Sequence, residues 1–227
     1  MNVVLLTHTP DPERVVAAAA RLCYADALPE EIMGSLSPEE IRAFLARLVE
    51  MDHLSPFEHA SFTFAVSGVS RALTHELVRH RIASYSQRSQ RYVKEEGFSF
   101  VTPPSVAADP EASRIFTATM AGLRQAYGEL LRLGIPKEDA RFVLPNACTT
   151  QIIVTMNARS LRHFFTLRCC GRAQWEIREL AWRMLALVRE VAPGLFINAG
   201  PPCEATGRCN QGKMGCGRAE EKRRSER

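Results

Sequence analysis

The residues best suited to chemistry lie in one short run, residues 79–92, with the sequence RHRIASYSQRSQRY. The run contains four arginines, one histidine, three serines, two glutamines and two tyrosines, and it has no acidic residue. Its four positive charges equal the formal net charge of +4 for the whole chain, so anionic partners are needed to offset their repulsion. Guanidinium groups and hydroxyls bind phosphate oxygens well. The run therefore predicts a site for a phosphate-bearing ligand.

A solvated basic segment or a nucleic-acid arm is the alternative interpretation of this run. The aromatic residues inside it, and the amphipathic helix expected to end close to Arg79, argue against that alternative. The sequence has no glycine-rich fingerprint after its first strand and no phosphate loop with Gly-Lys-Ser/Thr. If the protein binds nucleotides, arginine side chains must therefore replace the backbone amides of those motifs.

Two more segments place polar side chains at junctions between expected elements. Residues 53–59 (HLSPFEH) put Ser55 and Glu58 in a tight connection, where a turn with both side chains capping backbone amides is the alternative to a site. Residues 157–168 follow a strand and open a helix, a junction that often carries ligands. There Arg159 and His163 share one side at helical spacing, whereas Arg162 is expected to lie in water.

A near match to a zinc protease motif occurs at residues 75–80 (HELVRH). The two histidines are five residues apart, whereas that chemistry needs a spacing of four to share a helix face, so no metal is expected here. Glu76 and Arg79 lie three apart and so close together, as an ion pair or as the polar wall of a pocket.

Seven cysteines, without an export signal, indicate thiols or metal ligands rather than a disulfide framework. Cys203, Cys209 and Cys216 are spaced six and seven residues apart, unlike regular zinc motifs, and free thiols or a packed tail are favoured for them. The sequence has no apolar run long enough to span a membrane, and its start does not read as a signal peptide. A cytoplasmic protein is expected.

Hydrophobic content of 46% and charged content of 24% in 227 residues are ordinary for a globular enzyme. Strands are expected at residues 3–7, 60–69, 98–101 and 149–155. Helices are expected at residues 12–24, 37–51, 70–81, 111–133, 158–167 and 174–191, with a short one after Pro136. Short strands among helices predict a mixed α/β or α+β fold. The composition changes after Gly200, so we expect a catalytic domain at 1–200 and a Cys-, Gly- and charge-rich tail at 201–227.

Taken together, these segments resemble the flavin-dependent thymidylate synthases. Arg79-His80-Arg81, followed by seven residues and Ser89, is similar to the motif of that family. The similarity extends to residues 53–59, 141–145 (RFVLP), 157–161 (NARSL), 167–168 (LR) and 173–177 (AQWEI). It covers about residues 1–200, with the segments in the family's order.

The resemblance implies a reductive methylation of dUMP to dTMP. Methylenetetrahydrofolate would give the carbon, NADPH the electrons, and FAD would carry the hydride. It also implies a single mixed α/β (α+β) domain with a mixed, mostly antiparallel central sheet flanked by helices. The family assembles as a homotetramer with active sites shared between subunits, so we expect small-molecule substrates and neither nucleic acid nor membrane as partner.

The family's site residues are carried over by matching position. Those expected to contact FAD are Ser55, Arg79, His80, Arg81, Gln87, Asn157, Ala158, Arg159 and His163. Those expected to surround dUMP are Glu76, Arg79, Gln87, Arg88, Ser89, Gln90, Arg91, Arg141 and Arg168. The sequence departs from the commoner family pattern at three places, namely residues 76–78, residues 87–88 and His163.

The catalytic residue expected from this resemblance is Arg168, which would stabilise negative charge on the uracil imide. Ser89 has no histidine or acid nearby in sequence, whereas a nucleophilic serine needs an adjacent base. It is better suited to hydrogen-bond the dUMP phosphate. The alternative function is a basic nucleic-acid-binding module, which leaves Arg141, Asn157 and Arg168 unexplained and predicts binding that weakens steeply with salt.

Overall fold

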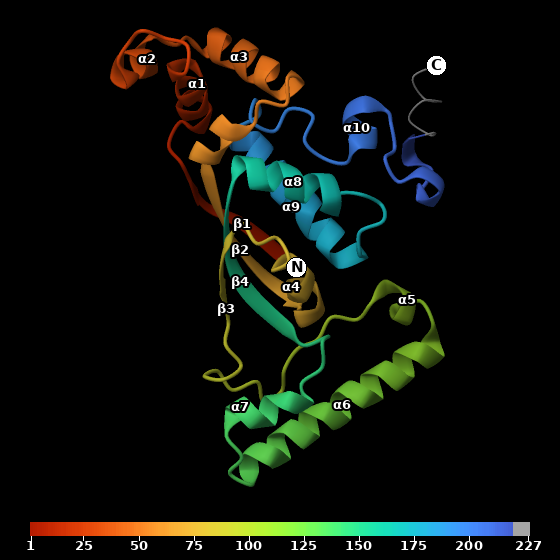
Figure 1. The fold of residues 1–227 in the computed structure, drawn as a ribbon. Coiled ribbons are helices and arrows are strands. Elements are labelled where there is room, and N and C mark those ends of the chain that lie inside the picture. Colours follow the sequence, from red (N-terminus) through yellow and green to blue (C-terminus); the bar gives the residue numbers. More distant parts are fainter. Residues whose placement is uncertain (220–227) are drawn as a thin grey trace. The chain divides into compact units, whose positions relative to one another are not determined.

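The structure, a computed structural model, describes residues 1–219 as two compact units (Figure 1). Unit 1 comprises residues 1–2, 66–79 and 85–153. Unit 2 comprises residues 3–65, residues 80–84 and the described chain from residue 154 onward. Among the described residues, no helix is both long enough and apolar enough to cross a membrane.

The strands are β1 (Asn2–His8), β2 (Ser61–Ser70), β3 (Ser84–Gln87) and β4 (Thr149–Asn157). The longer helices are α1 (Pro12–Leu22), α3 (Pro38–Glu50), α6 (Pro110–Arg132), α8 (Ala158–Arg168) and α9 (Trp175–Val191). The shorter helices are α2 (Pro29–Ser35), α4 (Arg71–Leu77), α5 (Pro104–Ala107), α7 (Lys137–Ala140) and α10 (Pro202–Thr206). Three 3-10 turns complete the described chain, namely η1 (Ser55–His59), η2 (Arg141–Val143) and η3 (Gly212–Met214).

The four strands form one antiparallel sheet in the order β1-β2-β4-β3. In β2 the side chains of Phe62, Phe64 and Val66 are buried and alternate with more exposed neighbours, as the period of two in the sequence predicts. β2 and β4 are the inner strands, and each contributes residues to both units. The prediction of a mixed α/β fold with an antiparallel sheet and helices is confirmed.

The core of unit 2 contains a chain of phenylalanine rings. Phe196 packs edge-on against Phe62 and Phe165, with ring centroids 5.3 and 5.9 Å apart, and Phe164 meets Phe165 at 5.7 Å. Edge-to-face contacts of this kind add about 0.5–1.5 kcal/mol beyond the area they bury. Because α8 also contacts η1 and α9, the helix that carries Arg159, His163 and Arg168 is held on several sides.

The core of unit 1 is built around the long helix α6, drawn in green in Figure 1. Met120 of α6 packs with the buried side chains of Phe98 and Cys148, and Phe116 and Leu123 of the same helix cover this cluster. Tyr127, one helical turn further on, is fully buried. The residues that precede and follow Phe98 are therefore fixed against α6.

Several predicted boundaries were wrong. α4 ends at Leu77 rather than at about Arg81, because the Tyr85 hydroxyl donates to the Leu77 carbonyl at 2.8 Å and satisfies one of the last helical acceptors. The run at residues 79–92 is therefore not helical at its start and contains β3 instead. The strand expected at 98–101 is reduced to one bridge, between Phe100 and Cys148. The short helices α2 and α5 were not expected.

Candidate functional site

Gln87, the last residue of β3, ties the run at residues 79–92 to its neighbours in unit 1. Its amide nitrogen donates to the Thr74 hydroxyl at 3.0 Å and to the Thr150 hydroxyl at 3.3 Å. Thr74 belongs to α4 and Thr150 to β4, and both are buried. The resemblance assigns Gln87 to both FAD and dUMP. Its side chain fixes the end of β3 and so the start of the arginine-containing segment that follows.

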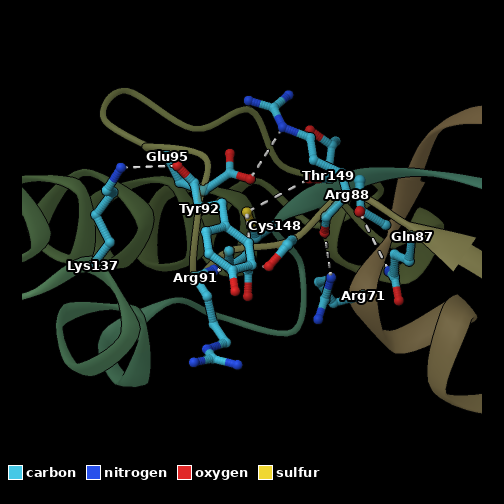
Figure 2. A network of polar contacts seen from close by, with 12 residues as sticks. Arg71, Gln87, Arg88, Arg91, Tyr92, Glu95, Lys137, Cys148 and Thr149 are labelled. Carbon is cyan, nitrogen blue, oxygen red and sulfur yellow. Dashed lines mark hydrogen bonds and ion pairs between the residues drawn. The ribbon is translucent and has the colours of Figure 1, made fainter.

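The next residue, Arg88, belongs to a network around a buried carboxylate (Figure 2). Arg88 Nε lies 3.6 Å from Glu95 Oε1, and the Glu95 side chain is only 8% exposed. The Glu95 amide in turn donates to the Tyr127 hydroxyl at 3.2 Å. Burial raises the pKa of Glu95, while the charges of Arg88 and Arg71 oppose that rise. Burial disfavours the charged form of Glu95, and the two nearby arginines stabilise it.

Arg71, the first residue of α4, approaches the same network. Its Nη1 donates to the Arg88 carbonyl at 3.4 Å, and the amide of Arg71 donates to the Cys148 carbonyl at 3.0 Å. Burial lowers the pKa of Arg71, and the nearby charge of Arg141 lowers it further, although an arginine keeps its proton at neutral pH. Arg71 and Arg88 therefore lie near one carboxylate, Glu95, and Arg141 lies near Arg71. The excess positive charge of the three guanidinium groups suits a bound anion.

Ser89 and Arg91 lie beside this network. The Ser89 hydroxyl accepts a hydrogen bond from the Arg91 amide at 3.2 Å, and no hydrogen bond in residues 1–219 joins it to a histidine or a carboxylate. Arg91 pairs with Glu138 at 2.9 Å, and both side chains are about half exposed. A pair this exposed is worth about 0–1 kcal/mol, so a ligand phosphate can compete for Arg91.

Gln90 is buried, and its amide donates to the sulfur of Cys148 at 3.8 Å. Burial raises the pKa of Cys148 to about 11, so its thiol keeps its proton. The side chain of Gln90 is therefore anchored to the residue that precedes β4.

In unit 2, α8 begins with the segment NARSL. The Asn157 side-chain oxygen accepts from the Ser160 amide at 2.8 Å and caps the helix, while the Ala158 amide donates to the Ala60 carbonyl at 2.8 Å. Arg159 pairs with Glu58 at 2.5 Å. Capping of backbone amides was the alternative for Glu58, but its carboxylate instead binds the guanidinium of Arg159.

At the other end of α8, Arg168 Nε donates to His80 Nε2 at 3.0 Å. Burial, followed by the charges of Arg168 and His163, lowers the pKa of His80 to about 4. His80 is therefore neutral at neutral pH and can accept this hydrogen bond. The ring of Phe164 packs edge-on against His80 at 4.9 Å, which holds the imidazole in place. Arg168 is thus oriented by an acceptor that does not cancel its charge.

The expectation that Arg162 lies in water was wrong. Its Nη1 donates to the carbonyls of Leu195 and Ile197 at 2.8 and 2.9 Å, and its guanidinium lies 5.8 Å from the ring centroid of Phe57. Burial lowers the pKa of Arg162 to about 10. Arg162 thus fastens the segment after α9 to α8, a structural function.

The structure divides the expected site residues between the two units. Those in unit 1 are Glu76, Arg79, Gln87, Arg88, Ser89, Gln90, Arg91 and Arg141. Those in unit 2 are Ser55, His80, Arg81, Asn157, Ala158, Arg159, His163 and Arg168. Apart from Arg79 and Gln87, the residues expected to contact FAD lie in unit 2, and apart from Arg168, those expected to surround dUMP lie in unit 1.

Sequence reasoning missed Arg71 and Glu95. Arg71 is an isolated charge between Ser70 and apolar residues at a helix start, and this pattern could have identified it as a candidate site residue. Glu95 sits in the charged stretch KEEG, which is typical of a solvated turn, so its burial was not visible from sequence.

Comparison with known proteins shows which family the chain belongs to. Residues 4–194 match the thymidylate synthase complementing protein family. The chain belongs to that family. It is 56% identical over 226 residues to the flavin-dependent thymidylate synthase of Geobacter sulfurreducens. The matched residues cover 99% of this chain and 97% of that protein.

Two further family members are also similar along most of their length. The flavin-dependent thymidylate synthase of Clostridium tetani is 50% identical, over 97% of this chain and 95% of that protein. The enzyme of the same name from Pyrococcus abyssi is 42% identical, over 94% of this chain and 91% of that protein. The family predicted from short motifs is therefore confirmed over nearly the whole chain.

Proposed function

We propose that this protein methylates dUMP to dTMP, with methylenetetrahydrofolate as carbon donor, NADPH as reductant and FAD as hydride carrier. The observation that carries the proposal is the arginine network of unit 1, in a chain whose relatives are named flavin-dependent thymidylate synthases. Arg71, Arg88 and Arg141 supply more positive charge than Glu95 removes. A nucleotide phosphate supplies the missing negative charge.

For dUMP, unit 1 provides the phosphate contacts. Arg88 is oriented by Glu95, Arg91 can exchange Glu138 for phosphate, and Ser89 offers a hydroxyl next to both arginines. The proposed dUMP-binding residues are Glu76, Arg79, Gln87, Arg88, Ser89, Gln90, Arg91, Arg141 and Arg168, to which the structure adds Arg71 as a candidate.

For FAD, the chain offers cations and polar groups of the kind that bind the two phosphates of this cofactor. Arg81 and Arg159 are exposed, and the exposed salt bridge from Arg159 to Glu58 can open at little cost. The proposed FAD-binding residues are Ser55, Arg79, His80, Arg81, Gln87, Asn157, Ala158, Arg159 and His163. When bound, FAD supplies hydride transfer, which no amino-acid side chain provides.

Arg168 is the proposed catalytic residue. The bond from its Nε to neutral His80 orients the guanidinium, and a neutral imidazole adds no negative charge beside it. A fixed cation next to the uracil imide stabilises the negative charge that develops there. Ser89 lacks the hydrogen-bonded base that a nucleophilic serine needs, so it acts as a ligand for phosphate.

The same proposal includes a homotetramer with sites shared between subunits and a location in the cytoplasm. One modest chain must provide sites for dUMP, FAD, folate and NADPH, and sharing residues between copies is one way to do so. The seven cysteines are all free in the described chain, which fits a reducing compartment. We also propose that residues 1–200 perform the chemistry and that the tail from residue 201 takes no part in it.

A direct test starts from the colour of the purified protein. We expect a yellow protein that releases FAD on denaturation and oxidises NADPH when both dUMP and methylenetetrahydrofolate are present, with dTMP as product. The same mixture without dUMP is the control. A colourless protein that also fails to take up added FAD would contradict the proposal, as would binding of nucleic acid with steep salt dependence and no dTMP formation.

A further inference from the structure

One pocket of unit 2 brings together cysteines that are far apart in the sequence. It is lined by Cys170, which follows α8, and by Cys203, Cys209 and Cys216 of the tail. These are four of the seven cysteines of the chain. Cys23, by contrast, is exposed at the end of α1 and does not line the pocket. The proposed nucleotide chemistry uses none of the four thiols.

Two of the pocket's thiols lie against the backbone of glycine residues. Cys216 Sγ lies only 2.8 Å from where a Cβ on Gly171 would stand, so the sulfur rests against the backbone next to Cys170. Cys209 Sγ likewise lies 3.4 Å from where a Cβ on Gly215 would be. The glycines in these turns thus leave room for sulfur atoms.

The chemistry of the lining selects one class of ligand. Within the described residues the pocket is lined by no histidine and no carboxylate, so its only strong metal ligands are thiols. Four thiolates without oxygen ligands favour a tetrahedral zinc ion over magnesium or calcium. A zinc ion with four thiolates carries a net charge of −2, and Lys213 and Arg218 line the same pocket. Lys213 offsets part of that excess, whereas Arg218 also pairs with Glu204 at 3.7 Å.

The tail has little else to hold it in place. In the described part of the tail the apolar side chains that are buried belong to Pro201, Cys203 and Ala219, and the chain turns at Gly207, Gly212 and Gly217, all with positive φ. A segment with so small a core usually needs a metal or a crosslink to fold. The thiols are not yet closed around a centre, because residues 1–219 contain no ready-made group of three metal ligands. The metal binding proposed below therefore includes a rearrangement of the thiols.

We propose that Cys170, Cys203, Cys209 and Cys216 bind one zinc ion that fastens the tail to the connection between α8 and α9. Four thiols each release a proton to solvent, and four zinc–sulfur bonds form without any change in oxidation state. The site lies outside the proposed nucleotide chemistry and does not depend on it. It also replaces the sequence-based preference for free thiols in the tail.

The test uses the full chain, reduced, loaded with zinc and freed of excess metal, with metal content measured by mass spectrometry. We expect about one zinc per chain. The single variants Cys209→Ser and Cys216→Ser should lose most of that zinc, and both positions are exposed, so neither change should unfold the protein. Cys23→Ser is the matched control, an exposed cysteine outside the pocket, and it should keep the zinc.

Cobalt gives a second reading of the same site. Cobalt-loaded protein should show the thiolate charge-transfer band and the intense visible bands of a tetrahedral four-sulfur centre, and the Cys216→Ser variant should lose them. Zinc content that is absent, or equal in the Cys209→Ser variant and the unchanged protein, overturns the proposal. Recovery of the four cysteines as disulfides from freshly purified protein overturns it as well.

Discussion

In unit 1 the Arg88 guanidinium lies 3.6 Å from a buried carboxylate, whereas in unit 2 the Arg168 guanidinium donates to a neutral imidazole at 3.0 Å. Both arginines are positioned by a partner from another segment of the chain. Glu95 also cancels part of the charge that it positions, while His80, with its pKa near 4, cancels none. The arginine proposed to bind phosphate and the arginine proposed to act in catalysis are thus held by different chemistry.

The difference matches the two tasks proposed for these residues. A phosphate is itself a strong anion, so a cluster of arginines can share one internal carboxylate and still bind the phosphate. The uracil imide becomes negative only as the reaction proceeds, so the cation facing it must already be held in a fixed orientation. Each prediction below changes one side of this comparison.

The largest expected effect belongs to Arg168→Ala. Removing one charged donor from such a site typically lowers turnover by ~10²–10³. FAD content should stay normal, because Arg168 is not among the proposed FAD contacts. Turnover and bound flavin measured on the same preparation check this. Loss of flavin in proportion to activity would show that Arg168 holds the cofactor instead.

Glu95→Gln tests the unit 1 side of the comparison. The change leaves Arg71 and Arg88 without their buried carboxylate, and we expect a loss of about 1–3 kcal/mol in the free energy of unfolding. Saturating dUMP should recover part of that loss, because its phosphate supplies the missing charge and binds only the folded protein.

Glu58→Gln is the matched control, because it removes an exposed partner of Arg159. Its effect on unfolding should stay within about 1 kcal/mol. Denaturant titrations of both variants, with and without dUMP, give the four values needed. Equal losses of stability for the two variants, unaffected by dUMP, would show that Glu95 does not stabilise the arginine cluster.

His80 gives a smaller effect that depends on pH. Its folded pKa, about 4, lies below its ordinary value of 6.5, so the unfolded chain binds the proton more tightly. This contribution to stability is complete above about pH 6.5 and is lost as the pH falls through 4. His80→Asn should therefore flatten the fall in stability between these values, measured by thermal unfolding across pH. The same slope in both proteins would contradict the assignment.

The sequence predicted well the helix starts that depend on neighbouring residues. Helix α8 begins at Ala158 after the cap at Asn157, and α4 begins at Arg71 after the cap at Ser70, at or within one residue of the expected starts. Glu95 and Arg162 could not be predicted, because their environment depends on partners far along the chain. Arg162, for example, binds carbonyls 33 and 35 residues away. A charged residue with a distant partner looks the same in sequence as one in water.

The central claim is that a fixed cation activates uracil while Ser89 only binds phosphate. Steady-state kinetics of Ser89→Ala over a wide range of dUMP concentrations tests it most directly. A phosphate contact acts equally on bound substrate and transition state, so KM for dUMP should rise while methylation survives at saturating dUMP. No turnover at any dUMP concentration, with FAD still bound, would contradict the account and indicate a covalent serine mechanism.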